Sequence, residues 1–362
     1  MRVQHIVPIS GGKDSTGVAC LMVERLARRP AGNLLPRFLH CDVGGNENSQ
    51  TMEYIDYLSD WLEREIGQRI EILRADFSEG LAARRANIER EWKTRKEFVM
   101  HDQACRAAQA KLDPADRPAH RKQCGCRVEV REPLSDEIIA EAKALLEPTG
   151  DPFLDLCLLK GRFPGTRSRF CTDELKLEPM RLVKVPIWQD GISTVEWIGE
   201  RADESPARAA KPRFQRIRRP EGRWVNQILY RPVHHLKADD MFSIAARHGL
   251  SPNPLYLQGA RRVGCWPCIM CGKDEIVNIA NRTPDHIDRL REWEKLVSKV
   301  SRRQWAAFFP DRRGLGSDDI DEQVAWARTS RGGKQFDLLR TKEMISADAD
   351  GLMCDSAYGL CE

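Results

Sequence analysis

A glycine-rich segment near the N-terminus has the residue types of a phosphate-binding loop. It lies between the apolar run 3–9 and a stretch whose apolar residues recur at near-helical spacing. Glycines let backbone amides point at an anion, and the N-terminus of the following helix adds a partial positive charge. We predict that this segment binds nucleotide phosphates, with its aspartate helping to place Mg²⁺; the alternative is an ordinary strand-to-helix turn. Its residues are Ser10, Gly11, Gly12, Lys13, Asp14 and Ser15.

A second loop, residues 199–208, presents two arginines beside acidic and hydroxyl side chains. Guanidinium groups suit bidentate contacts to the oxygens of oxyanions. We predict that Arg201 and Arg208 balance negative charge that develops during group transfer. The alternative interpretation is a solvated, charged turn. The other residues predicted to bind nucleotide here are Gly199, Glu204 and Ser205.

Three thiols within seven residues form a third candidate site. Cys265, Cys268 and Cys271 have the Cys-x-x-Cys spacing of zinc or iron–sulfur ligands. The chain has 12 cysteines, and because disulfides are rare in cytosolic proteins, clustered thiols favour metal binding. Iron–sulfur ligation, zinc ligation and unmetallated thiols all remain open from the spacing. The pair Cys124 and Cys126 is a weaker signal, for which we favour no metal.

Together these motifs resemble the phosphoadenosine phosphosulfate (PAPS) reductase family of the PP-loop ATP pyrophosphatases. The loop at 10–15 lacks the Walker spacing Gly-x-x-x-x-Gly-Lys and is similar to the PP-loop. The second loop has the pattern Gly-x-Arg-x-x-Glu-Ser-x-x-Arg. Further similar segments are Asp42-Val43-Gly44 with Glu47, the Cys-Thr-x-x-Leu-Lys element at 171–176, and 253–259 running into Gly264-Cys265.

The resemblance implies a Rossmann-like α/β fold of the adenine nucleotide α-hydrolase type. In such open sheets the ligand lies across the carboxyl ends of the strands, and Asp42 and Gly44 are expected beside the nucleotide. The resemblance also implies that Lys176 balances charge in transfer. It implies Cys171 as the fourth cluster ligand, because family members with a [4Fe–4S] cluster use a cysteine at that element. We therefore expect a [4Fe–4S] cluster, with zinc as the alternative.

The intact loop bears on the expected activity. Reductases of the family usually carry an altered loop, because they bind a ready-made sulfonucleotide, whereas this chain keeps Lys13 and Asp14. The resemblance therefore favours ATP-cleaving relatives such as the sulfurtransferase of DNA phosphorothioation or the small subunit of ATP sulfurylase. It implies sulfur transfer through an adenylylated intermediate, with ATP, Mg²⁺ and a sulfur donor such as a cysteine desulfurase.

Two other functions remain open. The first is a reductase of adenylyl sulfate or PAPS that uses Cys361, because the segment 358–362 is similar in composition to the family's Glu-Cys-Gly-Leu tail. The second is a non-catalytic module that binds nucleic acid and keeps a nucleotide. Two basic segments interleaved with aromatics, 208–224 and 302–313, have residue types that suit phosphate contacts and base stacking. A solvated face or a flexible lid over the nucleotide is the favoured interpretation of both, and the net charge of +4 does not by itself indicate nucleic acid. A nucleic-acid acceptor that binds these basic segments remains open for the sulfur-transfer enzyme as well.

Alternating strands and helices are expected to position these loops around a parallel sheet. The nucleotide-binding domain is predicted to comprise 1–80 and 165–275. A charged, largely helical insertion or lid is predicted at 81–164, with a long helix over 81–110, followed by a helical region at 276–345 and a mobile tail at 346–362. The expected strands are 3–9, 35–41, 70–73 and 194–198, and the expected helices are 13–28, 49–66 and 238–248.

The composition fits a globular protein, with 31% charged and 41% hydrophobic residues. No apolar run approaches the roughly 18 residues that span a bilayer. The first residues lack the layout of a signal peptide. We expect a cytoplasmic protein with no membrane partner.

Overall fold

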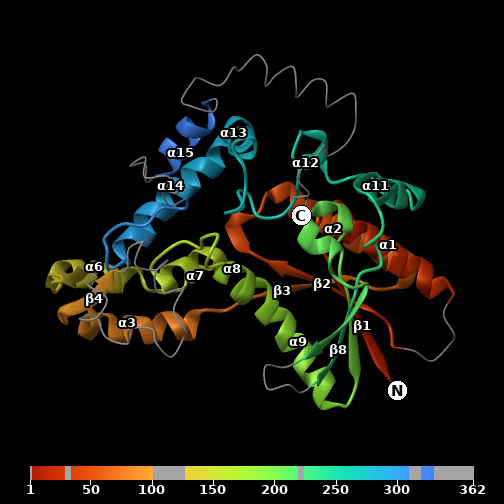
Figure 1. Cartoon of the computed structure of the whole chain (residues 1–362), viewed down its shortest axis with the longest axis horizontal. Helices are drawn as coiled ribbons and strands as arrows, with labels where there is room; N and C mark the ends of the chain where they lie inside the picture. Colours follow the sequence, from red (N-terminus) through yellow and green to blue (C-terminus); the bar gives the residue numbers. More distant parts are fainter. Residues whose placement is uncertain (1, 29–33, 101–126, 219–223, 310–318, 330–362) are drawn as a thin grey trace.

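The computed structural model describes residues 2–28, 34–100, 127–218, 224–309 and 319–329 of the 362-residue chain. Its centre is a six-stranded sheet with the strand order β3-β2-β1-β6-β8-β7 (Figure 1). The strands pair in parallel except for β7, which runs antiparallel to β8 at one edge. The strands are β1 (Val3–Pro8), β2 (Arg37–Asp42), β3 (Ile70–Arg74), β6 (Ser193–Trp197), β7 (Phe214–Arg218) and β8 (Trp224–Tyr230).

Helices cover both faces of this sheet, which gives a Rossmann-like α/β architecture. Ile6 and Val7 are adjacent and fully buried, yet they belong to different hydrophobic clusters, because successive side chains of a strand point to opposite faces. The Val7 face packs against α1 (Lys13–Ala27), α2 (Ser49–Ile66) and α11 (Ala238–Arg247). The Ile6 face packs against α9 (Glu178–Gln189).

The predicted elements of the sheet domain are confirmed, and α2 has the predicted bounds. Its ends follow from local chemistry: the Asn48 side chain accepts a hydrogen bond from the amide of Gln50, and Gly67 ends the helix in the left-handed conformation at φ +66°. None of the helices among the described residues is long and apolar enough to cross a membrane.

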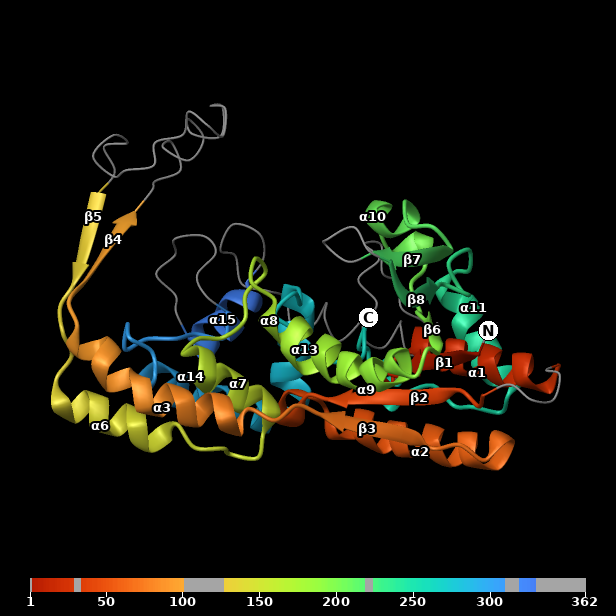
Figure 2. The ribbon, with the colours of Figure 1, turned by 90° about the horizontal axis from the view of Figure 1, so that it is seen from below.

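The remaining long helices form a second body beside the sheet, and they share one hydrophobic core (Figures 1 and 2). Leu81, Leu156 and Phe308 are fully buried in this core, although they come from the region predicted as an insertion and from the C-terminal region. These two regions therefore pack as one unit. Its helices are α3 (Ser78–Lys93), α6 (Asp136–Leu145), α7 (Pro152–Lys160), α13 (Lys273–Arg282), α14 (Pro284–Lys299) and α15 (Ile320–Ala327).

The long helix predicted over 81–110 is wrong, because α3 ends at Lys93. Thr94 is extended at φ −90° and ψ 125°, and its hydroxyl donates to the Arg90 carbonyl, which ends the helix. The strand β4 (Lys96–Met100) then pairs antiparallel with β5 (Arg127–Arg131). The residues after Lys93 form a strand because pairing of β4 with β5 outweighs the weak helical preference of this charged segment. Residues 101–126, including Cys124 and Cys126, lie outside the described residues.

Candidate nucleotide and thiol site

The glycine-rich loop connects β1 to the N-terminus of α1, at the carboxyl end of the central strand. Gly11 has φ +73°, and a Cβ there would come within 2.9 Å of Thr51 Cγ2, so the turn requires glycine. The Asn253 side chain donates a hydrogen bond of 3.2 Å to the Gly11 carbonyl. The loop is therefore held in one tight conformation from outside.

Some of the loop's own polar groups are engaged with one another. The Ser10 amide donates to Ser15 Oγ at 3.1 Å, and Ser15 Oγ donates to the Gly12 carbonyl at 3.0 Å. The Lys13 amide donates to the hydroxyl of Tyr256 at 3.0 Å. Within the described residues, the amides of Gly11 and Gly12 have no hydrogen-bond acceptor. These two amides are the donors that the loop offers to an anion.

Tyr256 belongs to the site, although its role was not predicted. It lies in the short helix α12 (Pro254–Leu257), and its ring centroid is 5.6 Å from Lys13 Nζ. The sequence signal was the segment 253–259, which was noted only as a similarity. Asn253 caps α12 by accepting from the amide of Leu255 at 3.0 Å, and this cap orients Tyr256 toward the loop.

The second loop meets the first through Arg201, which is 2% exposed. Arg201 Nε donates to Asp14 Oδ1 at 2.5 Å, and its other nitrogens lie 2.8 Å from Asp203 and 3.5 Å from Glu204. Arg208 forms an ion pair with the same Glu204. Asp14 also lies 3.4 Å from Lys13 Nζ. The predicted Mg²⁺ aspartate and the predicted charge-balancing arginine are thus bound to each other.

Gly199 explains how closely the two loops approach. A Cβ at Gly199 would come within 3.0 Å of the Asp14 carbonyl carbon, so the end of β6 lies directly against the start of α1. Ser205 Oγ accepts from the Arg208 amide at 3.2 Å and caps α10 (Pro206–Ala209). The residues predicted for this loop are therefore brought together with the phosphate loop.

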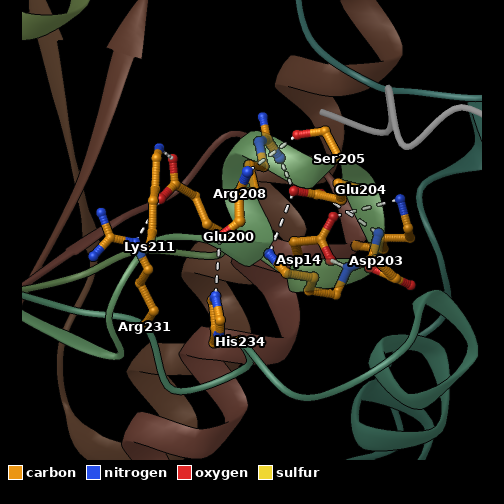
Figure 3. Close-up of polar contacts among 11 residues, drawn as sticks. Asp14, Glu200, Asp203, Glu204, Ser205, Arg208, Lys211, Arg231 and His234 are labelled. Carbon is orange, nitrogen blue, oxygen red and sulfur yellow. Dashed lines mark hydrogen bonds and ion pairs between the residues drawn. The ribbon is translucent and has the colours of Figure 1, made fainter.

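Glu200 ties the adjoining basic segment to the same loop (Figure 3). It accepts from Lys211 Nζ at 2.5 Å and from Arg231 Nε at 2.6 Å. Burial acts to raise the pKa of Glu200, but the hydrogen bonds from these two cations hold it below its ordinary value. The charge of Lys211 is consequently directed at a carboxylate of the protein.

The turn after β2 carries Asp42 and Gly44. Asp42 Oδ1 accepts from the Gly44 amide at 2.7 Å, and Gly44 has φ +70°. The Gly45 amide donates to Asp151 Oδ2 at 2.7 Å. Asp151, which also caps α7, was not predicted; its signal is the helix-start dipeptide Asp151-Pro152. Asp42 and Gly44 thus form a turn that Asp151, at the start of α7, holds in place.

The thiol loop lies against this same turn. The Trp266 amide donates to the Asn46 carbonyl at 2.8 Å, and Glu47 forms an isolated β-bridge with Cys265. Cys171 lies in α8 (Phe170–Thr172), which leads through the π-turn Asp173–Leu177 into α9. The four thiols that border the same hydrophobic core are Cys171, Cys265, Cys268 and Cys271.

Electrostatics confirm that Cys171 is near the thiol loop. Burial raises the pKa of the Cys171 thiol to about 11, and Cys265 and Cys268 add to this rise. The Lys176 pKa is raised by the neighbouring Cys265, against the effect of burial. Arg262, which lies 3.3 Å from Glu275, also interacts with Cys268. Two cations therefore face the thiols.

Lys176 acts to lower the pKa of Cys171 and Cys265, but burial outweighs it and raises both, so metal binding would have to displace the thiol protons. Across the described parts of the chain, no three Cys, His, Asp or Glu side chains already have a metal-binding arrangement. By their chemistry alone, thiols are ligands of soft metals. Cys361 and residues 312–313 lie outside the described residues.

The parallel sheet and the glycine-rich loop at the carboxyl end of its central strand define a nucleotide-binding α/β protein. Residues 4–271 match the family model of the phosphoadenosine phosphosulfate reductase domain. The chain belongs to this family, whose members are enzymes that act on adenine nucleotides. It is also 37% identical to an "uncharacterized 37.8 kDa protein in gpa 5' region" of Escherichia phage 186, over 99% of this chain and 96% of the phage protein.

Proposed function

We propose that this protein cleaves ATP to activate an acceptor by adenylylation and then transfers sulfur to that acceptor. The observation that carries the proposal is the complete Ser-Gly-Gly-Lys-Asp-Ser loop, in which Gly11 and Gly12 keep their amides available at the N-terminus of α1. A loop that only received a ready-made sulfonucleotide would not need this full set of phosphate contacts.

In this proposal the acceptor attacks the α-phosphorus of ATP, the bond to the bridging oxygen breaks, and pyrophosphate leaves with the electron pair. The amides of Gly11 and Gly12 and the side chain of Lys13 bind the phosphate oxygens and Mg²⁺ accompanies the nucleotide. Lys13 is 4% exposed, and a buried charge acts on phosphates more strongly than one in water. The terminal sulfur of a persulfide on a donor protein, such as a cysteine desulfurase, then displaces AMP and forms a disulfide between acceptor and donor. A thiol reductant cleaves this disulfide, which leaves the sulfur on the acceptor and the cysteine on the donor.

Arg201 and Asp14 act as positioning residues in this scheme, because their contacts are with each other. They fix the second loop against the phosphate loop, where Arg208 lies within reach as a charge-balancing residue. Lys176 faces the thiols from the π-turn and is proposed to stabilise negative charge on them.

We propose that Cys171, Cys265, Cys268 and Cys271 hold a [4Fe–4S] cluster, with zinc as the alternative. Such a cluster, with one thiolate on each of its four irons, would supply a centre for electron transfer. The support is the Cys-x-x-Cys-x-x-Cys spacing and the proximity of Cys171, together with the two cations.

Pyrophosphate–ATP exchange tests the activity. We expect the wild-type protein to exchange labelled pyrophosphate into ATP in the presence of its acceptor, and Lys13→Met to lose at least about 100-fold of this rate. Arg64→Ala, an exposed change on α2, is the matched control and should keep the wild-type rate. A wild-type protein that neither exchanges pyrophosphate nor releases AMP with any acceptor contradicts the proposal.

Metal content tests the thiol assignment separately. We expect anaerobically purified protein to contain iron and acid-labile sulfide, and Cys265→Ser to lose most of both. Cys20→Ser, a change at a buried thiol in α1, should retain them. If the protein contains stoichiometric zinc and no iron, the four thiols would be assigned to a zinc site. If Cys265→Ser retains all of the metal, the assignment of Cys265 as a ligand is contradicted.

The family match supports one further candidate, a reductase of adenylyl sulfate or PAPS that uses Cys361 as its nucleophile. In that case Cys361→Ser should abolish sulfite release from the sulfonucleotide while nucleotide binding survives. Sulfite release unchanged by this substitution would exclude the tail thiol.

A further inference from the structure

A groove of about 860 Å³ lies in the helical body, away from the phosphate loop. We call it the basic groove. Its walls come from α3, the end of β5, the end of α7 with the loop that follows, and the segment after α14. Its apolar lining includes the buried rings of Trp92 and Phe163. Its ionisable lining residues are Arg84, Glu91, Arg131, Lys160, Arg162, Arg302 and Arg303.

The groove is strongly positive, with six basic residues against one acidic residue, a formal charge of +5. Arg84 donates to the carbonyls of Leu158 and Val300, and Arg302 donates to those of Glu91 and Thr94. Carbonyls are neutral, so these contacts hold the two guanidinium groups in place without cancelling their charges. Lys160 differs, because it lies 2.7 Å from Glu174.

Trp305 places an aromatic ring at this groove, and 38% of the residue is exposed. The preceding Gln304 has φ +55°, the one positive value outside glycine in the described chain. This conformation is held by the bond from the Gln304 amide to the Ser301 carbonyl and by the bond from the Ala306 amide to Ser298 Oγ. Strained backbone that its surroundings hold in place is concentrated at functional sites.

The groove adjoins the thiol site. Arg162 lines the groove, and its guanidinium lies 5.1 Å from the centroid of Phe170, the residue next to Cys171. Gly165 also lines the groove, and the six residue steps from Gly165 to Cys171 span at most about 22 Å. In both views α8 lies between the helical body and the sheet (Figures 1 and 2).

The other basic segment does not offer the same features. Lys211 and Arg231 are paired with Glu200, and Phe214 is stacked on Tyr230 with 4.4 Å between ring centroids and an angle of 11°. The charge of Lys211 is therefore paired with a carboxylate, and one face of the Phe214 ring is covered by Tyr230. In the basic groove, by contrast, Arg162 and Arg302 donate to neutral oxygens and the Trp305 ring is exposed.

We propose that the basic groove binds single-stranded nucleic acid, with Arg162 and Arg303 contacting phosphates and Trp305 stacking on an unpaired base. Cationic walls follow a phosphate backbone, and an exposed aromatic ring suits a base that is free of a duplex. The groove thereby presents a strand to the thiol site. That the strand is the sulfur acceptor rests on the function proposed above, whereas its binding does not.

Fluorescence anisotropy with a labelled 20-nucleotide single strand, as DNA and as RNA, tests this. We expect Trp305→Ala to weaken binding about 10-fold, Trp305→Phe to restore most of it, and Arg303→Ala to reduce the salt-dependence slope by about 0.7. The controls Arg64→Ala and Phe214→Ala should bind as wild type.

Four results would overturn the proposal. These are groove variants that bind like the wild type, equal weakening by the two controls, preference for a duplex of the same sequence, and displacement of the strand by inorganic tripolyphosphate at equal phosphate concentration. The last result would indicate a site for small polyanions.

The same measurements separate this proposal from the activity. Lys13→Met should bind the strand like the wild type while losing pyrophosphate exchange. If the strand is the acceptor, wild-type exchange should require it, and Trp305→Ala should need about 10-fold more strand to reach half of its maximal exchange rate. If the wild-type protein binds the strand but shows no pyrophosphate exchange, the proposed binding site in the basic groove is supported and the proposed ATP-cleaving activity is contradicted.

Discussion

Arg201 and Trp266 are each 2% exposed, yet they hold their loops in opposite ways. Arg201 joins the two nucleotide loops through ion pairs with Asp14, Asp203 and Glu204. Trp266 holds the thiol loop through neutral hydrogen bonds: its amide donates to Asn46, and its Nε1 donates to Thr283 Oγ1 at 2.9 Å.

The two regions differ in the charged groups that surround each anchor. Near the phosphate loop, paired carboxylates fix the buried arginine before any nucleotide binds. Near the thiols, the cations Lys176 and Arg262 face sulfur atoms, and the anchors carry no charge that would compete with them. An ionic anchor and a neutral anchor should respond differently to substitution and to pH.

The largest expected effect is that of Arg201→Met. Removing the arginine from this buried ionic network leaves Asp14 with Lys13 alone and Glu204 with Arg208 alone, and we expect the free energy of unfolding to fall by about 3–5 kcal/mol. Urea denaturation measures this loss. The matched control is Arg69→Ala, whose ion pairs are exposed and should change the free energy of unfolding little. A similar loss in both variants would contradict an ionic anchor.

His286, which lies beside Trp266, should make the stability of this region depend on pH. Burial, with Arg289 nearby, lowers its pKa from 6.5 to about 4, against a bond with the Trp266 backbone. The unfolded chain therefore takes up the proton first as the pH falls. The contribution of neutral His286 to stability is fully present above pH 6.5 and is lost as the pH falls toward 4, by up to about 3.5 kcal/mol.

Urea midpoints between pH 7.5 and pH 4.5 measure this slope. We expect His286→Gln to flatten it, whereas His235→Gln, at an exposed histidine, should leave it as in the wild type. A slope that survives His286→Gln unchanged would assign the acid sensitivity to other groups.

The smallest expected effect is that of Gly199→Ala. The new Cβ would lie 3.0 Å from the Asp14 carbonyl carbon, so the second loop must move away from α1, and we expect a loss of about 1–3 kcal/mol. Gly165→Ala, which has no atom within 4 Å of its Cβ position, is the control and should change stability little. Equal stability of the two variants would show that the loops are not in close contact.

Much of the sheet domain was predictable because its signals are local. The strand 70–73 and the helix 49–66 have the expected periods, and Asn48 and Gly67 mark the helix ends. The end of α3 was not predictable, since it depends on the pairing of β4 with β5. The two strands are distant in the chain, with Met100 opposite Arg127, so no local pattern indicates that they pair. Asp151 and Tyr256 were missed as site residues for the same reason: their partners are 106 and 243 residues away.

The sequence by itself determined which groups with useful chemistry are present and which short elements hold them: a glycine-rich turn before α1, two arginines after β6, and a cysteine triplet. Only the tertiary structure decided which of their charges remain available. It bound Arg201 to Asp14, left the amides of Gly11 and Gly12 without a partner in the described chain, and brought Cys171 to the thiol loop. The physical reason is that pairing of buried charges depends on which segments are neighbours in space, and spacing along the chain does not contain that information.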